Sequence, residues 1–275
     1  MQPLSNMKRR FYLVGLILLF VILLPIVIFF ADGYRYRSGS GFVQTGGIYI
    51  SVPYSNANVY FDRTLYGRSS FLRRSFYIDN LTPGQYVIRV EQPGANTWER
   101  TLYVEPQLVT DTSALLVPLE FEMLKIITAT STATTTRTLT RTAFQDMQTV
   151  FSKPLATTTA SSVAGLSVVL EKGNVYERRN QVNNILPPSN FCIRPSQCVS
   201  EIAIENGPDT AISAAYFGGG IIYAIKERGV FFSESDIRFA PVVVSLYPKK
   251  GADFRIIDDA LIVKDEAAYY EILGL

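Results

Sequence analysis

The chain contains 275 residues, of which 48% are hydrophobic, and this is enough for two modest domains with buried cores. Its 26 Lys and Arg nearly balance its 24 Asp and Glu, and it contains no His. The absence of His removes the side chain that most often transfers protons near neutral pH and most often binds metals. The composition therefore disfavours an enzyme and a metal site, and we expect no cofactor.

Residues 11–30 form an uncharged apolar run, FYLVGLILLFVILLPIVIFF. At about 1.5 Å rise per residue, a helix of this length matches a hydrocarbon core about 30 Å thick, so we predict a transmembrane helix. Pro25 is tolerated in such a helix. A cleaved signal peptide is the alternative, but the run exceeds the usual length of about 7–15 residues, and Phe29 lies where a cleavage site needs a small residue.

Basic residues precede the apolar run, which favours a cytoplasmic N-terminus, an exported remainder and location in the cell membrane. After the run, aromatic and basic side chains suit the lipid headgroup region. The predicted membrane-flanking residues are Lys8, Arg9, Arg10, Tyr34, Arg35, Tyr36 and Arg37. We therefore expect a cytoplasmic tail at 1–10, a membrane helix at 11–30 and a glycine-rich, flexible juxtamembrane linker at 31–46.

The exported part of the chain is close to neutral. Three of the 26 basic residues and none of the acidic ones lie in the first thirty positions, so the remainder has a net charge of about −1. Such a domain has little electrostatic attraction for nucleic acid or for an anionic membrane surface. We expect no nucleic-acid partner.

Residues 47–119 have the pattern of short strands separated by turns. The stretch GIYISV at 47–52 alternates apolar and polar or aromatic residues with a period of two. Pro83-Gly84 and Pro93-Gly94 mark turns between later strands. Strands of about six residues with turn signals every 8–14 or so residues predict a small antiparallel β-sandwich.

Within this region, residues 51–62 read SVPYSNANVYFD, residues 80–90 read NLTPGQYVIRV and residues 96–106 read NTWERTLYVEP. Through these stretches, residues 47–106 resemble the PEGA domain, a small β-sandwich module of bacterial and archaeal envelope proteins. Asn56 stands where the family motif has Gly, and Asn is the residue that best replaces Gly in a left-handed turn. The resemblance assigns a structural role to its motif residues. They are Ser51, Pro53, Asn56, Ala57, Val59, Tyr60, Asp62, Leu81, Pro83, Gly84, Tyr86, Val90 and Trp98.

Residues 120–162 are expected to form a Thr-rich linker region. Nine Thr lie between positions 128 and 142, and a second loop-like stretch covers 153–162. A Thr-rich edge strand is the alternative, because Thr favours extended structure. Together, the two stretches predict a domain boundary near residue 125.

The last part, 163–275, is again rich in strand patterns. We predict hairpins that turn at Lys172-Gly173-Asn174, at Glu227-Arg228-Gly229 and at Asp258-Asp259. Residues 221–232 and 260–272 share the order apolar strand, charged turn, aromatic strand, which resembles the outer hairpins of β-propeller blades. The segment is too short for a closed ring, so a partial propeller and an unrelated sandwich both remain open. The predicted fold class is an all-β ectodomain with one N-terminal transmembrane helix.

Cys192 and Cys198 are the two cysteines of the chain. In an exported domain the oxidising compartment favours a disulfide between them. Two partly buried free thiols are the alternative. A metal site is disfavoured, because there is no His and only two sulfurs are available.

No motif in the sequence indicates catalysis. Gly218-Gly219-Gly220 is not followed by the Lys and Ser or Thr of a phosphate-binding loop, so we predict a tight turn before a strand. The acidic residues around Asp258-Asp259 lack the pattern of a calcium loop. Aromatic side chains such as Tyr54 and Tyr66 either fill the sandwich core or stack on a sugar or a protein partner.

From these observations we expect a non-catalytic, single-pass membrane protein of the cell envelope, whose extracytoplasmic β domains bind a surface protein or a cell-wall polymer. Two alternatives stay open at this stage. One is an envelope polysaccharide hydrolase, because distant carboxylates in any fold can pair at an active site. The other is a sensor or assembly factor that acts through its membrane helix.

Overall fold

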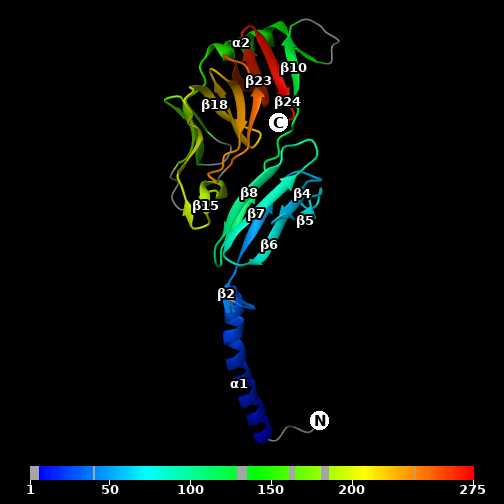
Figure 1. Cartoon of the computed structure of the whole chain (residues 1–275), viewed down its shortest axis with the longest axis vertical. Coiled ribbons are helices and arrows are strands. Elements are labelled where there is room, and N and C mark those ends of the chain that lie inside the picture. The colour runs from blue at the N-terminus through cyan, green and yellow to red at the C-terminus, as the bar shows by residue number, and fades with distance from the viewer. Residues whose placement is uncertain (1–5, 40, 129–134, 161–164, 181–185, 239) are drawn as a thin grey trace.

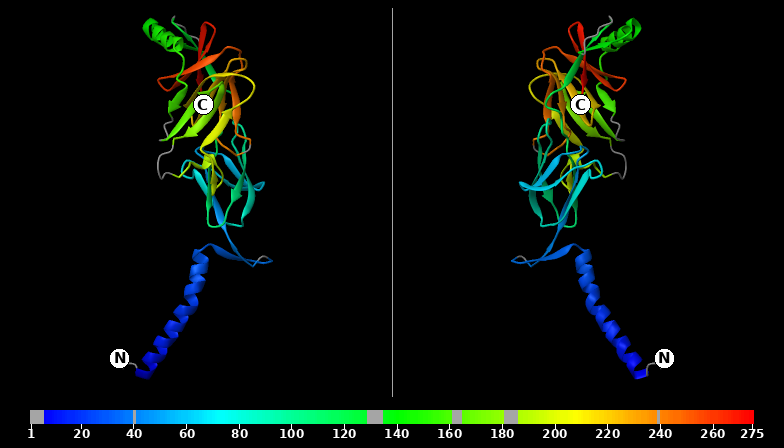
Figure 2. Two further views of the ribbon diagram at one scale, coloured as in Figure 1. Left: turned by 90° about the vertical axis from the view of Figure 1, so that its left-hand side faces the viewer. Right: turned by 90° about the vertical axis from the view of Figure 1, so that its right-hand side faces the viewer.

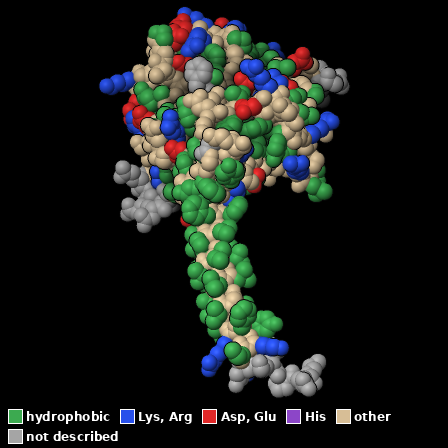
Figure 3. All heavy atoms as spheres, turned by 60° about the horizontal axis from the view of Figure 1, so that its bottom comes forward, with side chains coloured by type: hydrophobic (Ala, Val, Ile, Leu, Met, Phe, Trp, Pro, Cys, Tyr) green, Lys and Arg blue, Asp and Glu red, His purple; other side chains and the backbone are tan. Residues whose placement is uncertain are grey.

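The apolar run lies in one long helix. In the computed structural model, which describes residues 6–39, 41–128, 135–160, 165–180, 186–238 and 240–275, helix α1 spans Asn6–Ala31. Its 26 residues correspond to about 39 Å. No protein covers its apolar part, and Figure 3 shows hydrophobic side chains along the face of the helix that it presents. The helix is long and apolar enough to cross a membrane, and it is not a core helix of a soluble domain.

The helix, a β-sandwich and a second β domain follow one another along the long axis of the molecule (Figure 1). Nearly all of the described secondary structure beyond α1 consists of strands in antiparallel sheets. The predicted fold class is therefore confirmed.

The expected linker at 31–46 contains a β-hairpin, formed by β1 (Tyr34–Arg37) and β2 (Gly41–Gln44). Figure 2 shows this hairpin projecting sideways from the end of α1. The prediction of a flexible linker is thus wrong here. The strands YRYR and GFVQ pair in register and place Tyr36 and Phe42 opposite one another, with ring centroids 5.5 Å apart.

Hydrogen bonds tie the end of α1 and the hairpin to the sandwich. The Arg35 Nε donates to Asn80 Oδ1 at 2.9 Å, and the Arg37 guanidinium donates to the Asn80 carbonyl at 2.7 Å. The Gln107 side chain donates to the Asp32 carbonyl at 3.0 Å. The sandwich is therefore held in a defined position relative to the helix.

The sandwich has two sheets, and their inward faces carry its core. Ile48, Ile50, Val59, Ile88 and Val90 are fully buried, as the period-two pattern of their strands predicts. The first sheet has the order β6 (Ser75–Leu81), β3 (Gly46–Ser51), β9 (Val109–Ser113). The second has the order β5 (Thr64–Arg68), β4 (Asn58–Phe61), β7 (Gly84–Glu91), β8 (Trp98–Val104).

Within the sandwich, one described strand pair departs from the predicted antiparallel arrangement. Strand β9 lies parallel to β3, because the chain returns from β8 in the second sheet to the first sheet and enters it in the direction of β3. Both strands therefore end at the same edge of the sandwich, at Ser51 and Ser113. This edge faces the second β domain.

Several predicted turns are confirmed. Asn56 has φ 65°, the left-handed conformation expected for the position where the motif has Gly. Lys172 and Gly173, with φ 52° and 81°, turn the chain between β13 and β14, and Asp258 and Asp259 do so between β22 and β23.

The described part of the C-terminal domain contains three sheets of four or five strands. The first contains β12 (Thr158–Ala160), β13 (Leu166–Glu171), β14 (Asn174–Arg179) and β17 (Glu201–Glu205). The second contains β18 (Ala211–Phe217), β19 (Gly220–Ile225), β20 (Gly229–Ser233) and β21 (Val243–Tyr247). The third has the order β11 (Thr136–Thr138), β10 (Glu122–Ile127), β24 (Ala268–Leu273), β23 (Ala260–Asp265), β22 (Asp253–Ile257). The first two sheets each have four antiparallel strands in chain order, which is the strand order of propeller blades, whereas the third has five strands and includes the parallel pair β10 and β11.

The prediction of a linker at 120–162 is wrong, whereas the alternative of a Thr-rich edge strand is confirmed for β11, which lies at the edge of the third sheet beside β10. Strand β10 follows directly after the sandwich and pairs with β24, the last strand of the chain, so the start and the end of the domain share one sheet. Helix α2 (Arg141–Ser152) begins after Thr140, whose hydroxyl accepts a hydrogen bond from the Ala143 amide. Residues 129–134 of the Thr tract lie outside the described residues.

Helix α2 packs on the third sheet through one face. Met147 and Phe151 are buried there with Ile126 of β10, Ile262 of β23 and Tyr269 of β24. The Phe144 and Phe151 rings both contact the Tyr269 ring edge-on, with centroids 5.6 and 5.3 Å apart. This apolar cluster makes the 120–152 segment part of the domain.

Cys192 and Cys198 form a disulfide. They pair across the short hairpin of β15 (Cys192–Arg194) and β16 (Gln197–Cys198), which follows the 3-10 turn η1 (Ser189–Phe191). The bridge closes a loop that contacts the sandwich, where the Ser196 hydroxyl donates to Glu105 at 2.7 Å.

The role of β10 can be tested by truncating Ile126. Ile126→Ala removes buried methyl groups from the cluster against α2, so we expect it to lower the free energy of unfolding by about 2–4 kcal/mol. Lys125→Ala, on the exposed side of the same strand, is the control and should change it by less than about 0.5 kcal/mol. Chemical unfolding of the full chain in micelles, followed by circular dichroism, measures both. Equal stability of the two variants would mean that β10 does not belong to the domain.

Candidate functional site

A cluster of buried charged side chains joins the sandwich to the C-terminal domain. Arg100 of β8 forms an ion pair with Glu234, and its Nε lies 3.6 Å from Asp236 Oδ2. Arg238 binds the Asp236 carboxylate through Nε at 2.8 Å and through a terminal nitrogen at 2.7 Å. All four residues are at most 6% exposed. We call these four residues the interdomain charge cluster.

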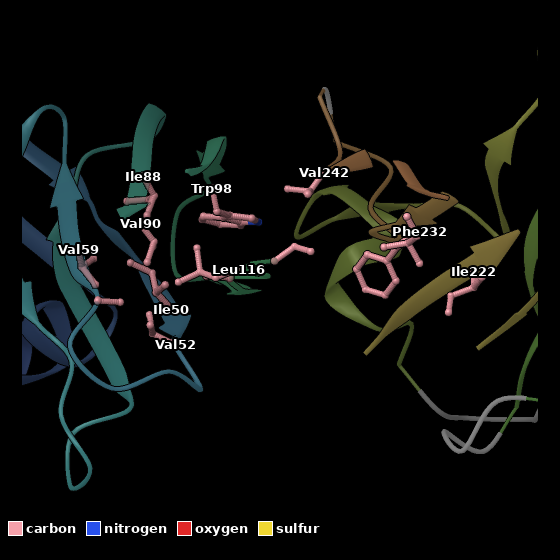
Figure 4. Close-up of a cluster of buried hydrophobic side chains, with 14 of the residues drawn as sticks. Ile50, Val52, Val59, Ile88, Val90, Trp98, Leu116, Ile222, Phe232 and Val242 are labelled. Atoms are coloured by element: carbon pink, nitrogen blue, oxygen red, sulfur yellow. The ribbon is translucent and has the colours of Figure 1, made fainter. Parts of the chain in front are cut away.

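Further hydrogen bonds fix this cluster from both domains. The indole of Trp98, which is fully buried, donates from Nε1 to Glu234 Oε1 at 2.8 Å. From the other direction, Arg238 donates to Thr112 Oγ1 at 3.2 Å in β9. Figure 4 shows Trp98 at the edge of the sandwich core, with its nitrogen directed toward the C-terminal domain.

The cluster is electrically balanced, because two guanidinium groups face two carboxylates. Burial raises the pKa of Glu234, and the charge of Arg100 and the Trp98 hydrogen bond oppose this rise. Ion pairs removed from water gain little net stability over apolar packing, but breaking one of them is costly. The cluster therefore favours the one arrangement of the two domains in which every buried charge is paired, because other arrangements would destabilise the folded protein.

Apolar packing continues across the same junction. Leu116 and Val117, just beyond β9, belong to one buried cluster with Phe232 and Val242 of the C-terminal domain. Figure 4 shows Leu116 and Val242 on the two sides of this contact. The two domains consequently share a continuous core.

Beside the charge cluster lies a cleft of about 620 Å³ between the two domains. The sandwich contributes its upper edge, with Pro53, Tyr54, Ser113 and Leu115. The C-terminal domain contributes residues of β13 and β14, the η1 turn, the Gly218-Gly219-Gly220 turn and the loop after β20. Because both domains line it, the cleft exists only in their joined arrangement.

A buried glutamate lies at the wall of the cleft. Glu177 of β14 is 2% exposed, and its carboxylate accepts hydrogen bonds from the hydroxyls of Tyr216 in β18 and Ser235 in the loop after β20. Asn190 holds that loop through a 3.0 Å hydrogen bond to the Ser235 carbonyl. Burial raises the pKa of Glu177, and the two hydroxyl hydrogen bonds partly oppose this. Among the described residues, Glu177 forms no ion pair with a Lys or Arg.

The glycine turn shapes the floor of the cleft. Gly218 and Gly219 have φ of 56° and 83°, which other residues rarely adopt. A Cβ on Gly220 would lie 2.5 Å from the Phe232 ring. The predicted tight turn before a strand is confirmed. The structure also shows that this turn lines the cleft, which the sequence did not predict.

The structure places most of the PEGA-like motif in the sandwich core and turns, and two members at the junction. Ala57, Val59, Val90 and Trp98 are fully buried, and Tyr86 stacks on Phe61 with centroids 5.2 Å apart. Pro53 lines the cleft and Trp98 binds the charge cluster. The remaining members lie at strand ends, in turns or half-exposed on strands: Ser51, Asn56, Tyr60, Asp62, Leu81, Pro83 and Gly84.

The predicted membrane-flanking residues lie at both ends of α1. Lys8, Arg9 and Arg10 are exposed at its N-terminal end, where Figure 3 shows basic side chains. Arg35 and Arg37 are bonded to Asn80 of the sandwich. Within the part of the chain that the structure describes, no group of three or more His, Cys, Asp or Glu residues is arranged to hold a metal ion.

The sequence interpretation missed Arg100, Glu177, Glu234 and Asp236. For two of them a signal exists, because a charged residue falls in phase with the buried residues of its strand. Glu177 lies two residues after Val175 on the same buried face of β14. Arg100 lies between Trp98 and Leu102 on the buried face of β8, two residues from each. A charged residue on an inward face needs a partner, and that partner marks a contact or a site.

No family model matches the chain, and no curated protein matches it.

Removing one member of the charge cluster tests its role. Arg100→Met leaves Glu234 buried without its cation, so we expect a loss of about 3–5 kcal/mol in the free energy of unfolding. Arg89→Met is the control. It breaks the half-exposed pair of Arg89 and Glu91 within β7, the strand next to β8, and should lower the free energy of unfolding by at most about 1 kcal/mol. Urea titrations of the full chain compare the two variants. A similar small loss for both would contradict the role given to the cluster.

Glu177→Gln should stabilise the protein near neutral pH. Because burial raises the pKa of Glu177, the folded state binds the proton more tightly than the unfolded state, and stability is lost as pH rises through the folded pKa. The variant lacks this loss, so its Tm advantage over the wild type should increase with pH. Glu171→Gln is the control of opposite sign, since a hydrogen bond from Arg178 lowers the pKa of Glu171. Thermal melts at several pH values measure both, and a constant or falling difference for Glu177→Gln would contradict this account.

Proposed function

We propose that this protein is a single-pass membrane protein of the cell envelope that binds a surface protein or a wall polymer without catalysis. Its N-terminus is cytoplasmic and its β domains lie outside the membrane. The exposed apolar helix, the basic residues at its N-terminal end and the Cys192–Cys198 disulfide support this topology. The sandwich is proposed to be a PEGA-like module.

The interdomain cleft is the proposed binding site, and one observation carries this proposal. The cleft is lined by both domains, next to the charge cluster that joins them, and it contains a buried carboxylate with no cationic partner among the described residues. Concave sites with a few convergent polar groups are the usual form of ligand sites. A buried carboxylate that lowers stability is a feature that binding sites retain.

The acidic side chains of the cleft favour binding over hydrolysis. Glu234 and Asp236 are occupied by Arg100 and Arg238, so Glu177 is the one acidic lining residue described without an arginine. Glycoside hydrolysis uses two carboxyl groups in complementary roles. A single carboxylate without a cationic partner among the described residues suits recognition of a ligand better than cleavage of a glycosidic bond.

The hairpin of β1 and β2 is proposed to lie in the headgroup layer of the membrane. Phe29 of α1 contacts the rings of Tyr34 and Phe42, at 4.8 and 6.0 Å between centroids, so the aromatic surface of the helix continues into the hairpin. Aromatic side chains concentrate at membrane interfaces. Together with the bonds to Asn80, this sets the cleft at a fixed height above the membrane.

Binding is passive in this proposal. The tether keeps the cleft close to the envelope surface, so a high effective concentration compensates for modest affinity. A fixed orientation adds to this effect, because fewer unproductive encounters occur.

Co-sedimentation with the envelope fraction of the source cells tests the proposal. The full chain in lipid nanodiscs should sediment with the fraction, and Ser113→Trp, which fills the mouth of the cleft, should reduce binding at least tenfold. Thr101→Trp, on an exposed position of β8 outside the cleft, is the matched control. If the unaltered chain does not sediment with the fraction, or if Ser113→Trp and Thr101→Trp bind equally well, the cleft is not the binding site.

A further inference from the structure

The charge of the cleft is concentrated at one point. Its charged lining residues are Glu177, Glu234, Asp236 and Arg238. Glu234 and Asp236 are neutralised by Arg100 and Arg238 in the interdomain charge cluster. The cleft therefore carries one unbalanced negative charge, and this charge lies on Glu177.

The environment of Glu177 is that of a carboxylate with an incomplete set of partners. Each of its oxygens accepts one hydroxyl hydrogen bond, from Tyr216 and from Ser235. A carboxylate oxygen has capacity for more than one hydrogen bond, so both oxygens can still accept from a ligand. A buried carboxylate is costly unless a cation compensates it, and a ligand cation would supply this compensation.

Part of the cleft lining is apolar. Tyr54 and Leu115 of the sandwich face the cleft, as do Leu166 and Phe217 of the C-terminal domain. Apolar walls with a single carboxylate match a cation carried on an aliphatic stem. Lysine has this form, because its four-carbon stem packs on apolar surface while its compact ammonium provides three donors. A guanidinium binds a carboxylate best through two parallel hydrogen bonds in one plane, whereas a compact ammonium can use the single acceptor positions left beside the Tyr216 and Ser235 hydroxyls.

We propose that the cleft binds a lysine side chain of a polypeptide partner, with its ammonium group at Glu177 between the Tyr216 and Ser235 hydroxyls. This proposal rests on the proposed function and names the ligand of the same cleft. It selects a protein partner in place of a wall polymer. The hydroxyls hold the carboxylate in position, and the apolar walls bind the lysine stem.

Ligand-detected saturation-transfer NMR with the full chain in nanodiscs tests this directly. The probe is Nα-acetyl-lysine methylamide, and its side-chain-acetylated form is the matched uncharged control. We expect the lysine probe to bind at least tenfold more tightly than the acetylated probe. Glu177→Gln should remove this preference, while Glu227→Gln, on an exposed hairpin and paired with Lys250, should keep it. Ser235→Ala, which removes one hydroxyl partner of the carboxylate, should weaken the preference.

Three results would overturn the proposal: no binding of the lysine probe, equal binding of both probes, or an unchanged preference in Glu177→Gln. Glucosamine binding as tightly as the lysine probe would also overturn it, because the amine would then belong to a polymer. The envelope assay separates this proposal from the proposed function. If Ser113→Trp abolishes envelope binding but Glu177→Gln does not, the cleft is the site and lysine is not its ligand.

Discussion

The arrangement of this protein depends on the charge cluster of Arg100, Glu234, Asp236 and Arg238 between its two β domains. Four charges buried together tolerate few geometries, because any displacement leaves a charge without its partner and without water. Apolar contacts between Leu116 and the C-terminal domain add area to the junction but are less directional. The charges therefore select the relative position of the domains, and this position creates the cleft.

The same logic applies at the other end of the sandwich. The bonds from Arg35 and Arg37 to Asn80 join the β1–β2 hairpin to the sandwich, and the charge cluster joins the sandwich to the C-terminal domain. In the proposed topology the position of Glu177 relative to the membrane is thus set by two polar junctions. A binding protein built in this way presents its site at a constant height and orientation, which favours a partner that is itself fixed at the surface.

The sequence predicted those parts of the fold that depend on interactions between residues close together in the chain. The apolar run, the period-two strands and the turn at Asn56 all follow from residues that are close in the chain. The pairing of β10 with β24 joins segments at opposite ends of the C-terminal domain, so no local pattern near residue 125 revealed it. Helix α2 had a readable signal in Phe144, Met147 and Phe151, which lie on one helical face, but the surrounding Thr tract suggested a linker. The cleft depends on residues from both domains, so no local pattern predicts it. Its one sequence signal is the charged residues Arg100 and Glu177 on the inward faces of their strands.

The most direct measurement is the distance between the two domains in the intact protein. Spin labels at Gln85→Cys in the sandwich and Lys226→Cys in the C-terminal domain would be read by pulsed electron spin resonance in nanodiscs, since both positions are exposed and the native cysteines are bonded to each other. A single narrow distance distribution that broadens in Arg100→Met is the expected result. A broad distribution in the unaltered junction, or a narrow one that Arg100→Met leaves unchanged, would show that the charge cluster does not hold the domains together.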